Sequence, residues 1–247
     1  MIIQRSGTAL LFITQPDHAR LAAAIMAAWR TDGLPDHPRR DTILLATREH
    51  DNGWLEEDQA TMVDGSGEPV DFISAPAAIK HRVWPRGAMR TGDADPYAGA
   101  LVARHALTVY GQQKTDAAWT PFFARMEAVE RELLARCPPD AAGTMASDYR
   151  FVQAGDQLSL VFCNRWTAPF PRSPLSGPGG AGKAGRTILK GTTLEISPDP
   201  FGGARVPLRV RARRLPARTF ASAAELRAAL DETPVTMIEG DAVGVAS

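Results

Sequence analysis

The sequence contains few cysteines, no excess of either charge and no long apolar run. Cys137 and Cys163 form neither a CxxC pair nor another metal-binding spacing, so a disulfide scaffold and a cysteine-based zinc site are excluded. The 28 basic residues equal the 28 acidic residues in number, so the net charge attracts neither nucleic acid nor an anionic membrane. The apolar run at residues 9–13 is far shorter than the roughly 20 residues that span a bilayer, and no signal-peptide pattern precedes it. We therefore expect a cytoplasmic protein, and we expect neither a membrane nor a nucleic acid as its partner.

Helical periodicity runs through the central part of the sequence. A helix that begins at Pro16 places His18, Leu21 and Ile25 on one apolar face, because these residues are spaced by three or four positions. A second helix, capped by Asp41, ends near a His-Asp doublet. The same reasoning assigns three further stretches: helices over 116–136 and 145–164, and loops with short helices over 56–94.

Two further expected helices carry a polar residue on their apolar face, as the first does with His18. Asp95 and Pro96 are a typical N-cap and first helical residue, and His105 falls on the apolar face of the helix that they begin. In the helix that ends near residue 164, Asp156 shares a face with Tyr149 and several apolar residues. Because a buried unpaired carboxylate is costly, Asp156 is expected to have a partner or a metal ion.

Both ends of the chain show strand patterns. Residues 2–5 and 9–13 predict a hairpin, and apolar and polar residues alternate in the C-terminal part. Nine of the twenty residues 167–186 are glycine or proline, which is typical of a loop. We therefore expect a mainly α protein with three parts: a helical metal-binding domain over 14–166, β-rich flanking segments over 1–13 and 187–247, and a Gly/Pro-rich loop over 167–186.

Histidine and aspartate recur on or beside these helices. The candidate metal ligands are His18, His50, Asp51, His81, His105 and Asp156. Taken singly, a histidine on an apolar face is most simply a core residue that hydrogen-bonds a carbonyl group. Taken together, imidazole and carboxylate groups suit Fe, Mn, Zn or Co, and one shared ion would satisfy both His18 and Asp156. We expect one or two divalent metal ions.

The order of these residues resembles the HD superfamily of metal-dependent enzymes. The segment LLATREHDNGW is similar to the superfamily's apolar helix ending in a His-Asp doublet, and AGDQLSL is similar to its late aspartate segment. The resemblance implies an HD-like helical bundle. The strand patterns, which lie outside the resemblance, add a small β-rich portion formed by the N-terminal hairpin and the C-terminal strands. The resemblance also implies a first ion held by His18, His50, Asp51 and Asp156, and a second completed by His81 and His105 and bridged to the first by Asp51. The segments QPDHARLA, EHDNGW and PYAGALVARH also resemble a bacterial domain family of unknown function, which implies no activity.

The implied dinuclear site favours hydrolysis. Two ions activate water and stabilise in-line displacement at phosphorus, so we expect hydrolysis of a small phosphate ester or nucleotide by metal-bound hydroxide. Asp51 would be catalytic, and Arg104, beside His105, would bind the small anionic substrate. Further cationic candidates are Arg48, Lys80 and Arg82. Two alternatives stay open: a mixed-valence di-iron oxygenase on the same ligand set, and a non-catalytic metabolite sensor or scaffold with a structural metal site.

Arginines gather in the C-terminal strand pattern, in a stretch that contains no acidic residue. They are Arg205, Arg209, Arg211, Arg213, Arg214 and Arg218. The simplest interpretation is a solvated face, and the alternative is a stripe that binds an anion or a nucleic acid. Proteins that bind single-stranded nucleic acid usually interleave aromatic residues with basic ones. Phe220 is the aromatic residue nearest to these arginines, so we favour the solvated face.

Overall fold

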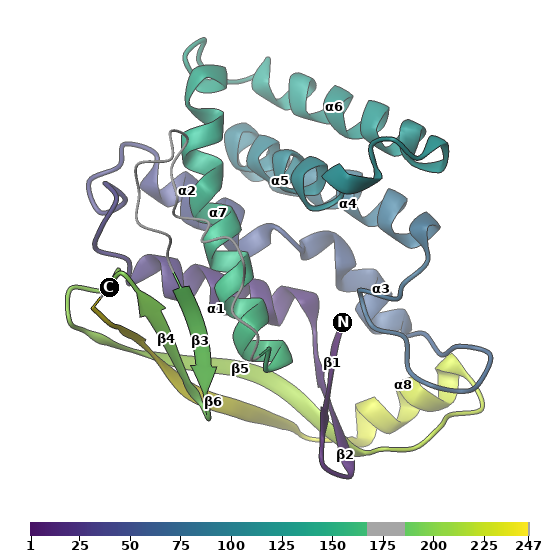
Figure 1. Ribbon diagram of the computed structural model, residues 1–247. Helices are drawn as coiled ribbons and strands as arrows, with labels where there is room; N and C mark the ends of the chain where they lie inside the picture. Colours follow the sequence, from purple (N-terminus) through teal and green to yellow (C-terminus); the bar gives the residue numbers. More distant parts are fainter. Residues whose placement is uncertain (167–185, 247) are drawn as a thin grey trace.

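Helices lie over a curled β-sheet in the computed structural model of the protein (Figure 1). The structure describes residues 1–166 and 186–246. The Gly/Pro-rich loop expected over 167–186 therefore falls outside the described residues, apart from Arg186, which begins a strand.

The described strands form a six-stranded sheet in the order β1-β2-β5-β6-β4-β3. They are β1 (Ile2–Ser6), β2 (Ala9–Ile13), β3 (Arg186–Lys190), β4 (Thr193–Ser197), β5 (Arg205–Pro216) and β6 (Val235–Gly244). β4 and β6 run parallel, and the other neighbouring pairs are antiparallel. The N-terminal hairpin joins the C-terminal strands through β2 and β5, where Leu10 lies opposite Leu215. One sheet thus unites the two ends of the chain.

The helices over this sheet come mostly from the middle of the chain. The α-helices are α1 (Gln15–Ala27), α2 (Arg40–Glu49), α3 (Leu55–Ala60), α4 (Ala77–Ala94), α5 (Pro96–Val109), α6 (Thr120–Leu134), α7 (Ala141–Asn164) and α8 (Ala223–Glu232). Three short 3-10 helices separate some of them: η1 (Asn52–Trp54), η2 (Gly111–Gln113) and η3 (Ala117–Trp119).

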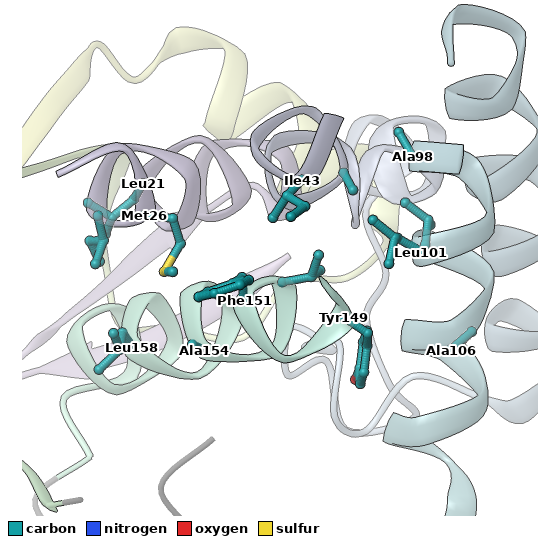
Figure 2. Packing of buried hydrophobic residues seen from close by; sticks show 14 of the residues in the cluster. Leu21, Met26, Ile43, Ala98, Leu101, Ala106, Tyr149, Phe151, Ala154 and Leu158 are labelled. Atoms are coloured by element: carbon teal, nitrogen blue, oxygen red, sulfur yellow. The ribbon is translucent and has the colours of Figure 1, made fainter. Parts of the chain in front are cut away.

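The main core joins α1, α2, α5 and α7 to the sheet. Figure 2 shows Met26 of α1 and Ile43 of α2 facing Phe151 of α7, and all three side chains are fully or almost fully buried. The same cluster contains Leu208 and Val210 of β5. The helices and the sheet therefore share one core.

The expectation of a mainly α protein with an HD-like helical bundle is wrong, because the structure is mixed α/β. The β-rich portion formed by the two ends of the chain is larger than the small one expected: β5 has 12 residues and β6 has 10. The strand patterns indicate that both ends form strands, but they do not show that one six-stranded sheet shares the main core with the helices.

Most of the predicted helices are present in the structure, and one predicted loop region is wrong. Asp95 caps α5 and accepts hydrogen bonds from the backbone of Tyr97 and Ala98, as expected, and α1, α6 and α7 lie near their predicted places. The prediction of loops with short helices over 56–94 is wrong for its second half, because α4 is an 18-residue helix that contains Pro85. Pro85 and two glycines, Gly87 and Gly92, weaken the helical signal of this stretch, and burial of Val83, Trp84 and Ala88 against neighbouring helices compensates for them.

Within the described part of the chain, no helix combines the length and the apolar character needed to cross a bilayer. The cytoplasmic location stays a prediction.

Candidate metal centre

Five of the six predicted ligands meet in the core, although they come from distant parts of the chain. His18 lies on α1, the His50-Asp51 doublet follows α2, His105 lies on α5 and Asp156 lies on α7. All five are buried. Their ligand atoms form two groups in which every atom lies within 4.8 Å of the others: His18, His50 and Asp51, and His50, His105 and Asp156.

The local sequence explains why α1 presents His18 inward. Thr14 caps the helix by accepting a hydrogen bond from the backbone of Asp17, and Pro16 suits the first turn. His18 then lies on the face of Leu21 and Ile25, which is buried against the rest of the core. The helix therefore fixes the imidazole at the end of an apolar stripe.

The doublet directly precedes a tight junction between η1 and α4. A Cβ atom on Gly53 would lie 2.0 Å from the carbonyl oxygen of Val83, so only glycine fits this contact. Arg90 donates to the carbonyl of Asn52 (2.8 Å), and Arg86 donates to that of Gly53 (3.1 Å). These contacts fasten the turn that directly follows His50 and Asp51.

Close packing also brings Asp156 to the other ligands. A Cβ atom on the preceding residue, Gly155, would lie 2.8 Å from Thr47 Cγ2 and 2.9 Å from Met26 Cγ. The glycine thus lets α7 approach α1 and α2 closely. The carboxylate of Asp156 then reaches the imidazole of His50.

In each of the three histidines, Nε2 points to a carboxylate. His18 Nε2 lies 2.7 Å from Asp51 Oδ2, and His50 Nε2 lies 3.2 Å from Asp156 Oδ1 and 3.5 Å from Asp51 Oδ2. His105 Nε2 lies 3.6 Å from Asp156 Oδ2. The rings of His18 and His105 each contact that of His50 edge to face, with centroids 5.0 Å apart. His50 is therefore the centre of the cluster.

The opposite nitrogen of each ring, Nδ1, has a partner outside the cluster. His50 Nδ1 lies 2.7 Å from the carbonyl oxygen of Thr47, and His105 Nδ1 lies 3.1 Å from the Tyr149 hydroxyl. His18 Nδ1 lies 3.0 Å from Ser159 Oγ. Metal-binding histidines are typically oriented by partners of this kind, which leave the other nitrogen for the ion.

These partners decide where two of the ring hydrogens lie. A carbonyl oxygen only accepts, so His50 Nδ1 donates to Thr47. The Ser159 hydroxyl donates to the backbone carbonyl of Asp156 (2.8 Å), so its oxygen accepts from His18 Nδ1. When His18 and His50 are neutral, each Nε2 therefore presents a lone pair to a carboxylate, and a cation is needed between them.

The ionisable groups of the cluster strongly affect one another's pKa. Burial opposes ionisation of Asp51, but His50 and His18 outweigh it and lower the pKa of Asp51. Burial likewise opposes ionisation of Asp156, and the hydrogen bond from His50 together with His105 lowers its pKa to about 2. Burial lowers the pKa of His50, but the two carboxylates outweigh burial and raise it to about 9. For His105 burial prevails, and its pKa falls to about 4.

The carboxylates are the part of the cluster nearest to solvent. The Asp51 and Asp156 side chains keep 6% and 11% of their surface exposed, whereas those of His18 and His50 are fully enclosed. A small molecule would therefore approach from the carboxylate side.

His81, the sixth predicted ligand, lies in a different environment. Its ring stacks on Phe122 and meets Trp119 edge to face, with centroids 5.2 and 4.8 Å away. Its buried Nε2 has no hydrogen-bond partner, and among the described residues it belongs to neither ligand group. The residue that α4 presents to His105 is Trp84, one turn later, with ring centroids 5.5 Å apart. Coordination of a second ion by His81 stays a prediction.

Arg104 faces away from the ligand cluster to a carboxylate on α6. Its Nε lies 2.7 Å from Glu130 Oε1, and its Nη2 donates to Glu130 Oε2 (2.9 Å). The other cationic candidates also have partners: Arg48 pairs with Glu49, Lys80 donates to the carbonyl of Ile73, and Arg82 pairs with Glu57. The structure thus brings none of these cations to the ligands, and anion binding by Arg104 stays a prediction.

The three residues that orient the ligands were not among the predicted site residues. Ser159 follows Asp156 by three positions on α7. Thr47 lies on α2, three positions before His50. Tyr149 lies two turns before Asp156 and contacts His105. Helical spacing from an assumed ligand would have indicated all three, since residues three, four or seven apart share a helix face.

The ligand set suits a single transition-metal ion. Three imidazole nitrogens and two carboxylates are the donors that Zn, Fe, Mn and Co take in proteins. The two ligand groups share His50, whose Nε2 faces both Asp51 and Asp156, and one nitrogen lone pair binds one ion, so the groups cannot each hold an ion through this atom. The two negative charges of the aspartates would balance the two positive charges of one divalent ion.

Comparison with known proteins adds a family but no activity. No curated protein and no solved structure matches the chain significantly. None of the family matches supports membership of the HD superfamily. A family model described as a protein of unknown function, DUF3891, matches residues 1–217. The chain therefore belongs to the DUF3891 family.

Proposed function

We propose that this protein holds a divalent transition metal at the buried cluster and uses it to hydrolyse a small phosphate ester or nucleotide. The ligands would be His18, His50, Asp51, His105 and Asp156. When bound, the ion would supply the positive charge that activates water and stabilises the oxygens of a phosphoryl group.

One observation carries the metal site: the environment of His50. Its Nδ1 hydrogen is committed to the carbonyl of Thr47, so a neutral ring directs a bare Nε2 toward Asp51 and Asp156. Without a metal the ring must take up a second proton to avoid this repulsion. With a metal the same three groups become its ligands, and the buried negative charges are neutralised.

The reaction class rests on a resemblance. The order of His18, the His50-Asp51 doublet and Asp156 resembles the HD superfamily, in which hydrolases are the larger group. The ligand geometry supports one ion more directly than two, because His81 does not join the cluster. It therefore does not favour the di-iron oxygenase, which needs two ions.

The protein's own groups would divide the remaining work. Ser159, Thr47 and Tyr149 hold the imidazole rings so that Nε2 faces inward. Asp51 and Asp156, the two partly exposed ligands, face the side from which a substrate would approach. The apolar packing around the histidines excludes water from the other sides.

The test combines metal content with turnover. Protein purified without an affinity tag or chelator is analysed by inductively coupled plasma mass spectrometry, beside Asp51→Ala and the control Asp41→Ala. Asp41 is fully exposed on α2, so its variant should match the wild type. We expect about one ion per wild-type chain, loss of the ion in Asp51→Ala, and metal-dependent hydrolysis of at least one member of a panel of phosphomonoesters, phosphodiesters and nucleotides.

Each part of the proposal has its own contrary result. A wild-type protein that takes up no added Zn, Mn, Fe or Co would overturn the metal site and identify the cluster as an ion-pair network. A stoichiometric ion without hydrolysis of any panel member would overturn the reaction class and leave a sensor or scaffold. Two irons per chain together with oxygen consumption would identify the oxygenase.

A further inference from the structure

A cavity of about 330 Å³ lies between α1, α3, α8 and β5, on another face of α1. Figure 1 shows α8 and the β1-β2 hairpin at the same end of the sheet. The wall of the cavity includes Pro16 and Arg20 of α1, Leu55 of α3, and Arg227 of α8. Pro16 and Arg20 lie two positions before and after His18, so each is turned by about 200° from it around the helix axis. The cavity is therefore separate from the ligand cluster.

Four arginines line this cavity: Arg20, Arg211, Arg213 and Arg227. Two of them are neutralised locally, because Arg20 Nη1 lies 2.7 Å from Asp17 and Arg227 Nε lies 2.7 Å from Asp231. A third carboxylate of the wall, Asp58, is also engaged. It pairs with the amino group of Met1 and accepts a hydrogen bond from the backbone of Gln15 (2.6 Å).

Within the described part of the chain, neither of the other two arginines has an acidic partner. Arg213 donates to the carbonyl oxygen of Thr233 (3.2 Å), and Arg211 is exposed. Throughout residues 1–166 and 186–246, no carboxylate forms an ion pair with either of them. Since they are two positions apart on β5, their side chains leave the same face of the strand with Cα atoms about 7 Å apart. The cavity thus carries two uncompensated positive charges that can reach one group.

Besides the polar residues Thr14 and Gln59, the remaining wall contains several apolar side chains. Phe12 and Leu230 are buried beside the cavity, and Leu55 and Val235 line it while keeping 42% and 40% of their surface exposed. Large apolar side chains exposed to this extent are few among the described residues, and two of them meet here. Exposed apolar surface next to a cavity of this size is typical of a ligand site.

We propose that this cavity binds a small amphipathic dianion, with a phosphate or phosphonate head on Arg211 and Arg213 and an apolar body against Leu55, Val235 and Leu230. Two guanidinium groups match the charge and the geometry of a phosphoryl head. The proposal does not depend on the metal site. It also assigns a role to two arginines of the C-terminal stripe that the sequence analysis interpreted as a solvated face.

The experiment measures binding to metal-free protein by isothermal titration calorimetry, after removal of metal with a chelator. The probe is phenylphosphonate, which carries the dianionic head and an apolar ring and has no ester bond to hydrolyse. Inorganic phosphate tests the head alone, and benzyl alcohol tests the apolar body alone. We expect phenylphosphonate to bind at least about tenfold more tightly than inorganic phosphate, and benzyl alcohol not to bind.

Variants locate the binding. Arg211→Gln with Arg213→Gln should weaken phenylphosphonate binding by at least about tenfold, because both charged donors are lost. Arg209→Gln is the matched control, because Arg209 lies on the same strand, pairs with Glu239 and does not line the cavity; its affinity should equal that of the wild type. Melting temperatures check that each variant is folded.

Two results would overturn the proposal. One is the absence of phenylphosphonate binding to the folded wild type. The other is binding that survives the double arginine replacement but disappears in His50→Ala, which would place the anion at the ligand cluster instead.

Discussion

At the scale of single residues, the cluster is defined as much by the partners of its histidines as by the histidines themselves. Ser159 both donates to the Asp156 backbone carbonyl and accepts from His18 Nδ1. It thereby fixes the side of the ring that faces Asp51. A residue of this kind tunes a metal site without touching the ion.

Replacement of Ser159 by alanine should weaken metal binding while leaving the fold intact. We expect the affinity for Zn²⁺ to fall by about 10- to 100-fold, because His18 loses the group that holds its tautomer and orientation. Ser147→Ala is the matched control: Ser147 lies on the same helix, is exposed and donates to the carbonyl of Thr144. Calorimetric titration with Zn²⁺ gives both affinities, and equal values for the two variants would contradict the orienting role.

The pH dependence of the metal-free protein should report His50. Its pKa is raised from an ordinary value of 6.5 to about 9, so the folded protein holds a proton that the unfolded chain has lost. Its contribution to stability is complete below pH 6.5 and disappears as the pH rises through 9, and it amounts to about 3 kcal/mol. His105 acts in the other direction and in another window, because its pKa is lowered to about 4 and stability falls as the pH drops from 6.5 toward 4.

Thermal unfolding measured from pH 6.5 to 9 tests the His50 prediction, because the His105 effect falls below this window. The chelated protein should lose stability across this window, whereas the zinc-loaded protein should lose much less, because the ion takes the place of the His50 proton. A flat profile for the chelated protein would show that His50 is not protonated in the folded state.

At the scale of elements, the junction of η1 with α4 is the narrowest contact beside the site. Gly53 and Gly87 face each other there, and a Cβ atom on Gly53 would overlap the carbonyl of Val83. The His-Asp doublet directly precedes this contact. The position of the doublet therefore depends on a helix that contributes no ligand to the cluster.

Gly53→Ala should destabilise the protein and disturb the metal site together. The overlap is with backbone, which cannot rotate away, so we expect a loss of about 1–3 kcal/mol or more, with weaker metal binding. Gly65→Ala is the control, because a Cβ atom there meets nothing within 4 Å. Chemical denaturation measures the free energy of unfolding of both variants. Equal values would show that η1 can move away from α4 without loss of stability.

Elements were predictable where one local signal dominated. The Asp95-Pro96 start and the apolar periodicity of α1 are local signals, and the structure confirms both. The stretch that becomes α4 contains Pro85 and two glycines, which oppose a helix locally. Its helical structure depends on burial of Val83, Trp84 and Ala88 against other helices, which the sequence does not display as a clear period.

At the scale of the whole molecule, metal binding should stabilise the fold, because the ligands come from four separate parts of the chain. An ion present at about 100 times its dissociation constant adds about 2.7 kcal/mol. For a protein of this size, we expect a chelator to lower the melting temperature by roughly 5–10 °C. His50→Ala should show no such difference, and an unchanged wild-type melting temperature would contradict a tightly held ion.

The expected domain over residues 14–166 can be tested in the same way. Its core is shared with Ile2 and Ile13 of the N-terminal hairpin and with Leu208 and Val210 of β5. Without these strands the isolated segment would expose much of that surface, so we expect it to lack a cooperative unfolding transition. A sharp transition by circular dichroism would show that residues 14–166 fold independently.

The sequence by itself determined the helices with strong periodicity, the two strand-forming ends and the identity of five residues that meet in the core. These features are local or depend on the chemistry of single side chains, so they can be predicted from the order of residues along the chain. The tertiary structure decided the mixed α/β architecture, the exclusion of His81 from the cluster and the pairing of Arg104 with Glu130. It also placed Arg211 and Arg213 at a cavity. Each of these depends on contacts between residues far apart in the chain, and no spacing along the sequence specifies which faces of two distant elements will pack together.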